Sequence, residues 1–161
     1  ETVILTGYDS ARASVVCLAQ IPSRHGGLRV FENIGTAFPL HLGATAKAVL
    51  AHLPAASIQS VLDGKLNAGN PAHKQSRAHL AKQLSEIRAQ GFVLSFEETY
   101  AGVAGVAVPL LSPLGQALGS VAIAAPLHRF DASTSRSYTE HLLAAGMLLR
   151  KRIGGCVPAA A

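Results

Sequence analysis

Two apolar segments that flank the sequence SPLG constrain the fold more than any other part of the chain. Residues 103–111 read VAGVAVPLL and residues 117–125 read ALGSVAIAA. Side chains alternate between the two faces of a strand, so each segment has one face of small side chains and one of larger ones. SPLG carries Ser, Pro and Gly at positions typical of a type I turn. The pattern predicts a β-hairpin.

The register of this hairpin decides whether its two small faces coincide. With an even number of loop residues, Gly105 pairs with Ala122 and Ala107 pairs with Ser120, so the small faces meet. A one-residue bulge at Gly115 would reverse that match. We favour the first register because it gathers the larger side chains on one core face: Val106, Val108, Val121 and Ile123. The opposite face then carries a small-residue floor, defined as Gly105, Ala107, Ser120, Ala122 and Ala124.

The space above this floor has two candidate occupants. Each missing methylene forfeits about 1 kcal/mol of burial and contact energy, so an empty floor is unfavourable. Either a helix packs closely on the floor or a ligand fills the space, and the hairpin residues leave both options open.

The rest of the chain predicts a single mixed α/β (α+β) domain over residues 1–153, followed by a loose tail over 154–161. Apolar and β-branched runs predict strands at 2–8, 14–21, 28–35 and 92–97. Helical spacing predicts a helix from Gly43 that Pro54 ends, a short helix that Gly64 stops, a helix capped by Gly91, and a last helix over about 133–152. The turn residues of 67–73 predict a loop.

Charge and hydropathy exclude several classes of protein. The net charge is +5, but the basic residues are scattered, and the one cluster, RKR at 150–152, closes a helix. Direct nucleic-acid binding by this segment is therefore not expected. No apolar run approaches the roughly 20 residues that span a bilayer, and no signal peptide is visible, so we expect a cytoplasmic protein. Because the chain starts at Glu1 without Met, we expect a fragment of a longer protein.

Catalytic and metal-binding patterns are absent from the sequence, so we expect no catalytic residues, metal or cofactor. Cys17 lies in an apolar run and is expected to be a buried thiol, and the histidines lack metal-ligand spacing. Glu97 and Glu98 are neighbours on a predicted strand, so they point to opposite faces and cannot converge on one substrate. We therefore expect them to have a structural role or to lie at the pocket rim. GVAGVAVP lacks the order of a dinucleotide-binding motif.

Two long motifs resemble the effector-binding domain of the IclR (isocitrate lyase regulator) family of bacterial transcription regulators. They are IGTAFPLHLGATAKAVLAHLP at 34–54 and EIRAQGFVLSFEETYAGVAGVAVPLLSPLGQALGSVAIAAPLHRF at 86–130. The resemblance implies a GAF-like or profilin-like fold, with a central, largely antiparallel sheet of about six strands, flanking helices and a small-molecule pocket on one sheet face. In that family the domain follows a winged helix-turn-helix, which we expect to be absent from this chain.

The resemblance also implies which residues line the pocket: Ala44, Thr45, Ser95, Val103, Gly105, Ala122 and Ala124. The last four lie on the hairpin face that carries the small-residue floor. Thr36, Phe38 and His41 are candidates for an additional part of the pocket. The chain departs from the family pattern where Ser95 replaces a common Asp, Ala46 replaces Gly and Ala101 replaces Pro. The Ser95 departure predicts an effector that differs in size or charge from the short oxo-acids that some members bind.

The start of the helix at Gly43 to Thr45 is the best anion site in the sequence, because unpaired N–H groups and the helix dipole favour a carboxylate. We therefore expect an organic acid as effector, aromatic acids included. Binding would act through a homodimer or homotetramer, with DNA contacted only by the missing N-terminal domain. Two alternatives remain: a ligand-free oligomerisation module of the same regulator, and a small enzyme domain acting on a carboxylic acid.

Overall fold

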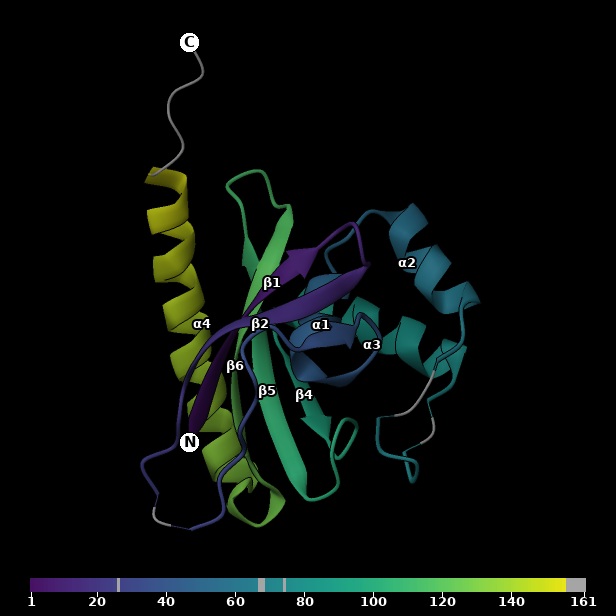
Figure 1. Ribbon diagram of the computed structural model, residues 1–161. Coiled ribbons are helices and arrows are strands. Elements are labelled where there is room, and N and C mark those ends of the chain that lie inside the picture. The colour runs from purple at the N-terminus through teal and green to yellow at the C-terminus, as the bar shows by residue number, and fades with distance from the viewer. Residues whose placement is uncertain (26, 67–68, 74, 156–161) are drawn as a thin grey trace.

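A six-stranded antiparallel sheet forms the centre of the computed structural model, which describes residues 1–25, 27–66, 69–73 and 75–155 (Figure 1). The strands are β1 (Thr2–Asp9), β2 (Ser14–Ile21), β3 (Ala37–Pro39), β4 (Val93–Phe96), β5 (Val103–Leu111) and β6 (Ala117–Pro126). Their order across the sheet is β3-β2-β1-β6-β5-β4, and every neighbouring pair is antiparallel. This is the largely antiparallel, mixed α+β fold that the sequence predicts.

Helices cover both faces of the sheet (Figure 1). They are α1 (Gly43–Leu50), α2 (Ala55–Asp63), α3 (Arg77–Gln90) and α4 (Ala132–Gly155), with a short 3-10 turn, η1 (Leu127–Arg129), before α4. One core contains residues of α1 and α3 with Ala107 and Ala122, while the other contains Leu142 of α4 with Val106, Val108 and Val121. The larger side chains of the hairpin therefore face α4, and the small-residue floor faces α1.

The two small faces of the β5–β6 hairpin coincide, as predicted, but the register differs by two residues. Gly105 pairs with Ala124 and Ala107 with Ala122, where the sequence predicted Ala122 and Ser120 as partners. The connection holds residues 112–116, and a register shift opposite Leu110 and Leu111 leaves Leu118 as the extra residue. A two-residue shift keeps every side chain on its predicted face. Gly115 adopts a positive φ of 79° in the SPLG turn, and its N–H donates to the Ser112 carbonyl at 2.9 Å.

The strand predicted at 28–35 is wrong, because the third strand is the shorter β3 at Ala37–Pro39. The apolar side chains that favoured a strand are exposed: Leu28, Phe31 and Ile34. Distant side chains, together with a backbone bond from the Gly35 N–H to the Cys17 carbonyl at 2.8 Å, bind this segment in place of a regular strand ladder. Thr2 donates to the Val30 carbonyl at 2.6 Å, and Gln20 accepts from the Glu32 N–H at 3.2 Å.

Two other boundaries differ from the predictions. Helix α1 ends at Leu50, and Pro54 caps the start of α2 instead of ending α1. Helix α4 continues through Gly155, so Gly154 and Gly155 are helical and do not belong to a loose tail. Residues 156–161 of the predicted tail, and 67–68 of the predicted loop, lie outside the described residues. Within the part of the chain that is described, no helix is long and apolar enough to cross a membrane.

The Asp131 carboxylate caps the start of α4. From this cap we predict that the domain loses stability in acid. Its Oδ1 accepts from the N–H of Thr134 at 2.8 Å and from the hydroxyl of Ser133 at 2.8 Å. These bonds lower the pKa of Asp131 to about 2, below the ordinary value of about 3.9. A lowered folded-state pKa adds stability that is present above the unfolded pKa and is lost as the pH falls through the folded pKa.

We therefore expect Asp131→Ala to lower the urea midpoint at pH 7, with a difference from the parent chain that narrows as the pH falls from about 4 to about 2. Urea unfolding followed at several pH values measures both quantities. A midpoint difference that stays constant across this pH range would contradict the assignment.

Candidate functional site

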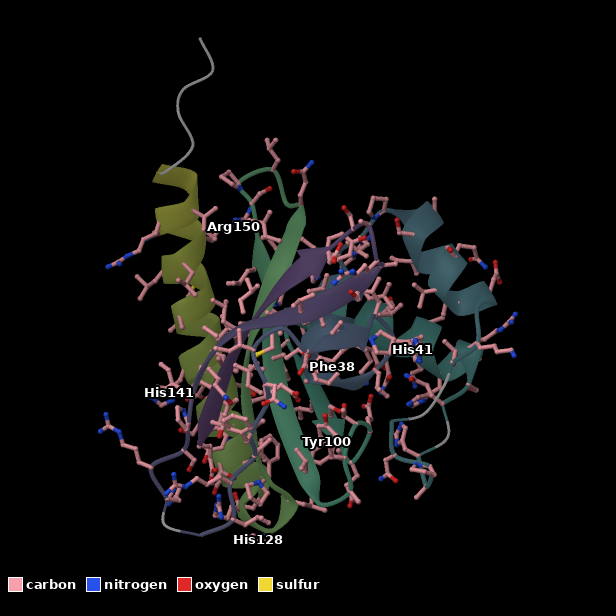
Figure 2. All side chains as sticks on the ribbon, in the orientation of Figure 1. Phe38, His41, Tyr100, His128, His141 and Arg150 are labelled. Atoms are coloured by element: carbon pink, nitrogen blue, oxygen red, sulfur yellow. The ribbon has the colours of Figure 1, made fainter. Side chains whose placement is uncertain are left out.

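A cavity of about 80 Å³ lies between the sheet and the start of α1. One water molecule requires about 10–15 Å³ on this measure, so the cavity holds several waters or a compact ligand. Phe38 and Tyr100, labelled in Figure 2, belong to its wall. The strands contribute Ile4, Thr6, Phe38, Ser95, Val103, Ala104, Gly105, Ala122, Ile123 and Ala124. Helix α1 and the connections between elements contribute Val30, Glu32, Gly43, Ala44, Thr45, Glu98, Thr99 and Tyr100.

The seven residues predicted to line a pocket all border this cavity: Ala44, Thr45, Ser95, Val103, Gly105, Ala122 and Ala124. Their role in binding a ligand stays a prediction. Of the three additional candidates, Phe38 borders the cavity, whereas Thr36 and His41 do not. The Thr36 carbonyl accepts from the N–H of Cys17 at 2.9 Å, which places the Thr36 backbone against β2. His41 is buried just before α1.

The small-residue floor is shared between a helix and the cavity. Ala107 and Ala122 are buried in the same core as α1, so close helix packing explains their small side chains. Gly105 and Ala124 are only half-buried and border the cavity. A Cβ atom at Gly105 would lie 3.3 Å from the Ile123 carbonyl oxygen and 3.9 Å from the Ala44 Cβ. Both occupants that the sequence left open are therefore compatible with the floor.

A buried ion pair holds the start of α1 against the β4–β5 loop. The Lys47 ammonium donates to Glu98 Oε1 at 2.5 Å, and the two side chains are 0% and 4% exposed. Lys47 also donates to the Gln83 side chain of α3 at 3.2 Å. Burial lowers the pKa of Lys47, and the neighbouring Glu98 carboxylate opposes that shift. The pair joins α1, α3 and the wall of the cavity.

The sequence predicted Glu97 and Glu98 on a strand, and this prediction is wrong because β4 ends at Phe96. Glu97 adopts a positive φ of 54°, and its carboxylate accepts from the N–H of Gly102 at 2.8 Å. Glu98 instead binds Lys47 and accepts from the N–H of Gly43 at 3.2 Å. The two carboxylates therefore bind separate partners inside the protein, which is a structural arrangement.

The contact from Gly43 also changes the predicted anion site, because Glu98 already occupies the first N–H of α1. The N–H groups of Ala44 and Thr45 have no hydrogen-bond acceptor among the described residues, and the N-cap residue Leu42 makes no side-chain hydrogen bond to α1. Ser95 is buried and borders the same cavity, and its hydroxyl makes no hydrogen bond within the same residues. These donors leave a smaller anion site than the sequence predicted.

Glu32 supplies a second buried carboxylate to the cavity wall. Its side chain accepts from the N–H of Asn33 at 3.2 Å and from the Tyr100 hydroxyl at 3.4 Å. Burial raises the pKa of Tyr100, and the charge of Glu32 raises it further, so the Tyr100 hydroxyl stays protonated and donates. Lys, Arg and His are absent from the described residues that border the cavity.

The sequence patterns predicted a structural or pocket-rim role for Glu98, but they did not reveal Lys47, Glu32 or Tyr100 as parts of the site. One signal for Lys47 was available: GATAKAVL is apolar almost all round, and a helix of that kind is buried, so its only charged residue needs a buried partner. The burial of Glu32 was not predicted, because residues 28–35 were predicted to form a strand.

The described residues offer a binding site more readily than a catalytic one. They contain no group of three His, Cys, Asp or Glu side chains that is able to hold a metal ion. Cys17 is fully buried, and burial raises the pKa of its thiol, which makes it a poor nucleophile. A largely apolar cavity with a few polar groups, on one face of an antiparallel sheet, is typical of a domain that binds a small molecule.

The chain belongs to the IclR family of bacterial transcription regulators, because the family model "Bacterial transcriptional regulator IclR C-terminal" matches residues 1–149. It is similar to the HTH-type transcriptional regulator XynR of Escherichia coli K12, at 30% identity over 125 residues, which cover 77% of this chain and 50% of XynR. The chain spans about half the length of the curated relatives that it matches. These relatives are named as transcription regulators, which agrees with the expectation that the chain is not an enzyme.

Solved structures of family members have the same fold. An IclR regulator from Silicibacter sp. TM1040 superposes with a TM-score of 0.89 at 29% identity, covering 98% of this chain and 62% of that one. An IclR homolog from Microbacterium hydrocarbonoxydans, solved with 4-hydroxybenzoate, superposes with a TM-score of 0.78 at 21% identity, covering 94% of this chain and 61% of that one. The predicted family and fold class are confirmed, and the chain is a C-terminal effector-binding domain.

Proposed function

We propose that this domain binds a small organic acid in the cavity and thereby alters DNA binding by the full-length regulator. The observation that carries the proposal is the cavity itself, which combines open hydrogen-bond donors with an apolar floor. The N–H groups of Ala44 and Thr45 and the hydroxyls of Thr45 and Ser95 suit a carboxylate. The surface over Gly105 and Ala124 suits the apolar body of the ligand.

Aromatic acids belong among the candidates. A regulator of the same fold was solved with 4-hydroxybenzoate, a compact aromatic acid. The open floor over Gly105 and Ala124 supports a flat body in this chain, because neither residue carries a side chain larger than a methyl group.

Coupling to DNA follows from linkage. A ligand changes DNA affinity only when it prefers one arrangement of the regulator over another. We propose that the regulator acts in the cytoplasm as a homodimer or homotetramer, that an N-terminal domain outside this chain contacts DNA, and that the acid favours one arrangement of the subunits.

A thermal-shift screen of this chain against aromatic and aliphatic carboxylic acids tests the proposal. We expect at least one acid to raise the melting temperature, because a ligand at 100 times its Kd adds about 2.7 kcal/mol of stability. If the folded chain responds to none of the acids, the proposal fails in favour of a ligand-free oligomerisation module. The burial of Ala107 and Ala122 in the core that contains α1 is the observation that supports this second candidate.

A further inference from the structure

Glu32 is a buried carboxylate in the cavity wall with no cationic partner among the described residues. The residue is only 7% exposed, and no described Lys, Arg or His forms an ion pair with it. The second carboxylate of the wall, Glu98, is different because the Lys47 ammonium neutralises it. Among the described residues, the cavity wall therefore has one acidic group, Glu32, without a cationic partner.

The hydrogen bonds of Glu32 leave part of its capacity unused. An ionised carboxylate offers about four acceptor sites. Glu32 uses two, for the N–H of Asn33 at 3.2 Å and for the Tyr100 hydroxyl at 3.4 Å. The Tyr100 bond is longer than the ordinary range for two oxygen atoms. A buried carboxylate is costly unless donors or cations satisfy it, so a donor that enters the cavity gains a strong, charge-assisted bond.

We infer that Glu32 accepts a hydrogen bond from the effector, which carries a hydroxyl or ammonium group in addition to its carboxylate. This inference rests on the proposed function and narrows the ligand class to hydroxy acids or amino acids. A dicarboxylic acid is disfavoured, because its second carboxylate would meet the charge of Glu32.

Tyr100 is the side chain that donates a hydrogen bond to Glu32 among the described residues. Its hydroxyl reaches Glu32 across 68 positions of sequence and joins the β4–β5 loop to the connection between β2 and β3. Both residues border the cavity. A donor on the ligand either binds Glu32 in addition to the Tyr100 hydroxyl or replaces that hydroxyl. The Tyr100 hydroxyl is therefore not required for the site to prefer acids that carry a hydroxyl or ammonium group.

The test compares para-substituted benzoates in titrations of the parent chain and of Glu32→Gln: benzoate, 4-hydroxybenzoate, 4-(aminomethyl)benzoate and terephthalate. We expect the parent to bind the hydroxyl or the ammonium compound at least about tenfold more tightly than benzoate, with terephthalate weakest. Whichever of 4-hydroxybenzoate and 4-(aminomethyl)benzoate binds more tightly identifies the donor group that Glu32 binds. Glu32→Gln is expected to lose the preference for the donor-bearing compounds, whereas Tyr100→Phe, which removes only the internal donor, is expected to keep it. Glu140→Gln is the matched control, because it makes the same change at an exposed position of α4 that does not border the cavity. Glu32→Asp, which keeps the charge but withdraws it, replaces Glu32→Gln if that variant does not fold.

Two outcomes overturn the inference while the proposed function stands: equal affinity for benzoate and its donor-bearing derivatives, or a preference that survives in Glu32→Gln. Tyr100→Phe overturns the inference if it loses as much of the preference as Glu32→Gln does. In that case the hydrogen bond between Tyr100 and Glu32 only shapes the cavity wall, and Glu32 does not accept from the ligand. If no acid binds, the proposed function fails, and phenol and benzylamine test Glu32 by itself. Binding of either compound that Glu32→Gln abolishes supports the inference, and the absence of binding overturns it.

Discussion

Ala124→Phe is expected to weaken effector binding by about 10- to 100-fold while the chain stays folded. Ala124 is half-buried, borders the cavity and pairs with Gly105 across β5 and β6. A phenyl group at this position projects into a cavity of about 80 Å³ and takes the space of the ligand. Overfilling a well-packed space costs about 1–3 kcal/mol, and each 1.4 kcal/mol is a tenfold change in Kd.

The neighbouring Ala122 is a poorer choice for the same experiment, although it also borders the cavity. It is almost completely buried in the core that contains α1, so a phenyl group there would displace the helix as well as the ligand. The structure therefore separates a floor residue that tests binding from one that tests packing.

Isothermal titration with the acid that gives the largest thermal shift measures the effect of Ala124→Phe. Ala19→Phe is the matched control, because it makes the same change at an exposed position of β2 that does not border the cavity. Unchanged affinity in Ala124→Phe, with a folded protein, would show that the ligand lies elsewhere. Equal losses in both variants would point to a general effect of the added phenyl group.

Lys47→Met is expected to destabilise the domain by about 3–5 kcal/mol, because it leaves the charge of Glu98 buried without a partner. The native pair is 0% and 4% exposed, and the N–H of Gly43 is the other donor to the Glu98 carboxylate. One N–H does not neutralise a carboxylate in a medium from which water is excluded. The free energy of unfolding in urea measures the loss.

Two further variants separate burial from charge. Lys82→Met removes an exposed partner of Glu86, in a pair 3.8 Å apart with side chains 76% and 55% exposed, and is expected to change stability by less than about 1 kcal/mol. The double variant Lys47→Met with Glu98→Gln removes both charges and is expected to recover much of the loss. A double variant that is less stable than Lys47→Met would contradict the buried-charge explanation.

The β5–β6 hairpin shows how far sequence reasoning reached in the site. The two-residue period of small and large side chains was visible in the sequence, and it correctly assigned the face that borders the cavity. The register depended on the extra residue Leu118 and on the connection at 112–116, and it was wrong by two positions. A shift of two residues keeps every side chain on the same face of the sheet, so the small-residue floor was predicted correctly despite this error.

The segment at 28–35 shows the opposite case. Its alternation of apolar residues predicted a strand, yet its backbone binds the side chains of Thr2, Gln20 and Arg129, which come from distant parts of the chain. Local alternation does not report such partners. This segment places Glu32 in the cavity wall. The wrong prediction of a strand here therefore also hid the negative charge of the site.

By itself, the sequence determined the elements whose signals are local. These are strands β1, β2, β4, β5 and β6, helices α1, α2, α3 and α4, the turn at SPLG and the small face of the hairpin, because each depends on neighbours a few residues apart. The tertiary structure alone decided which distant groups meet: Lys47 with Glu98 across 51 positions and Tyr100 with Glu32 across 68. Long-range contacts of this kind depend on how the elements pack, and they set the charge and shape of the cavity.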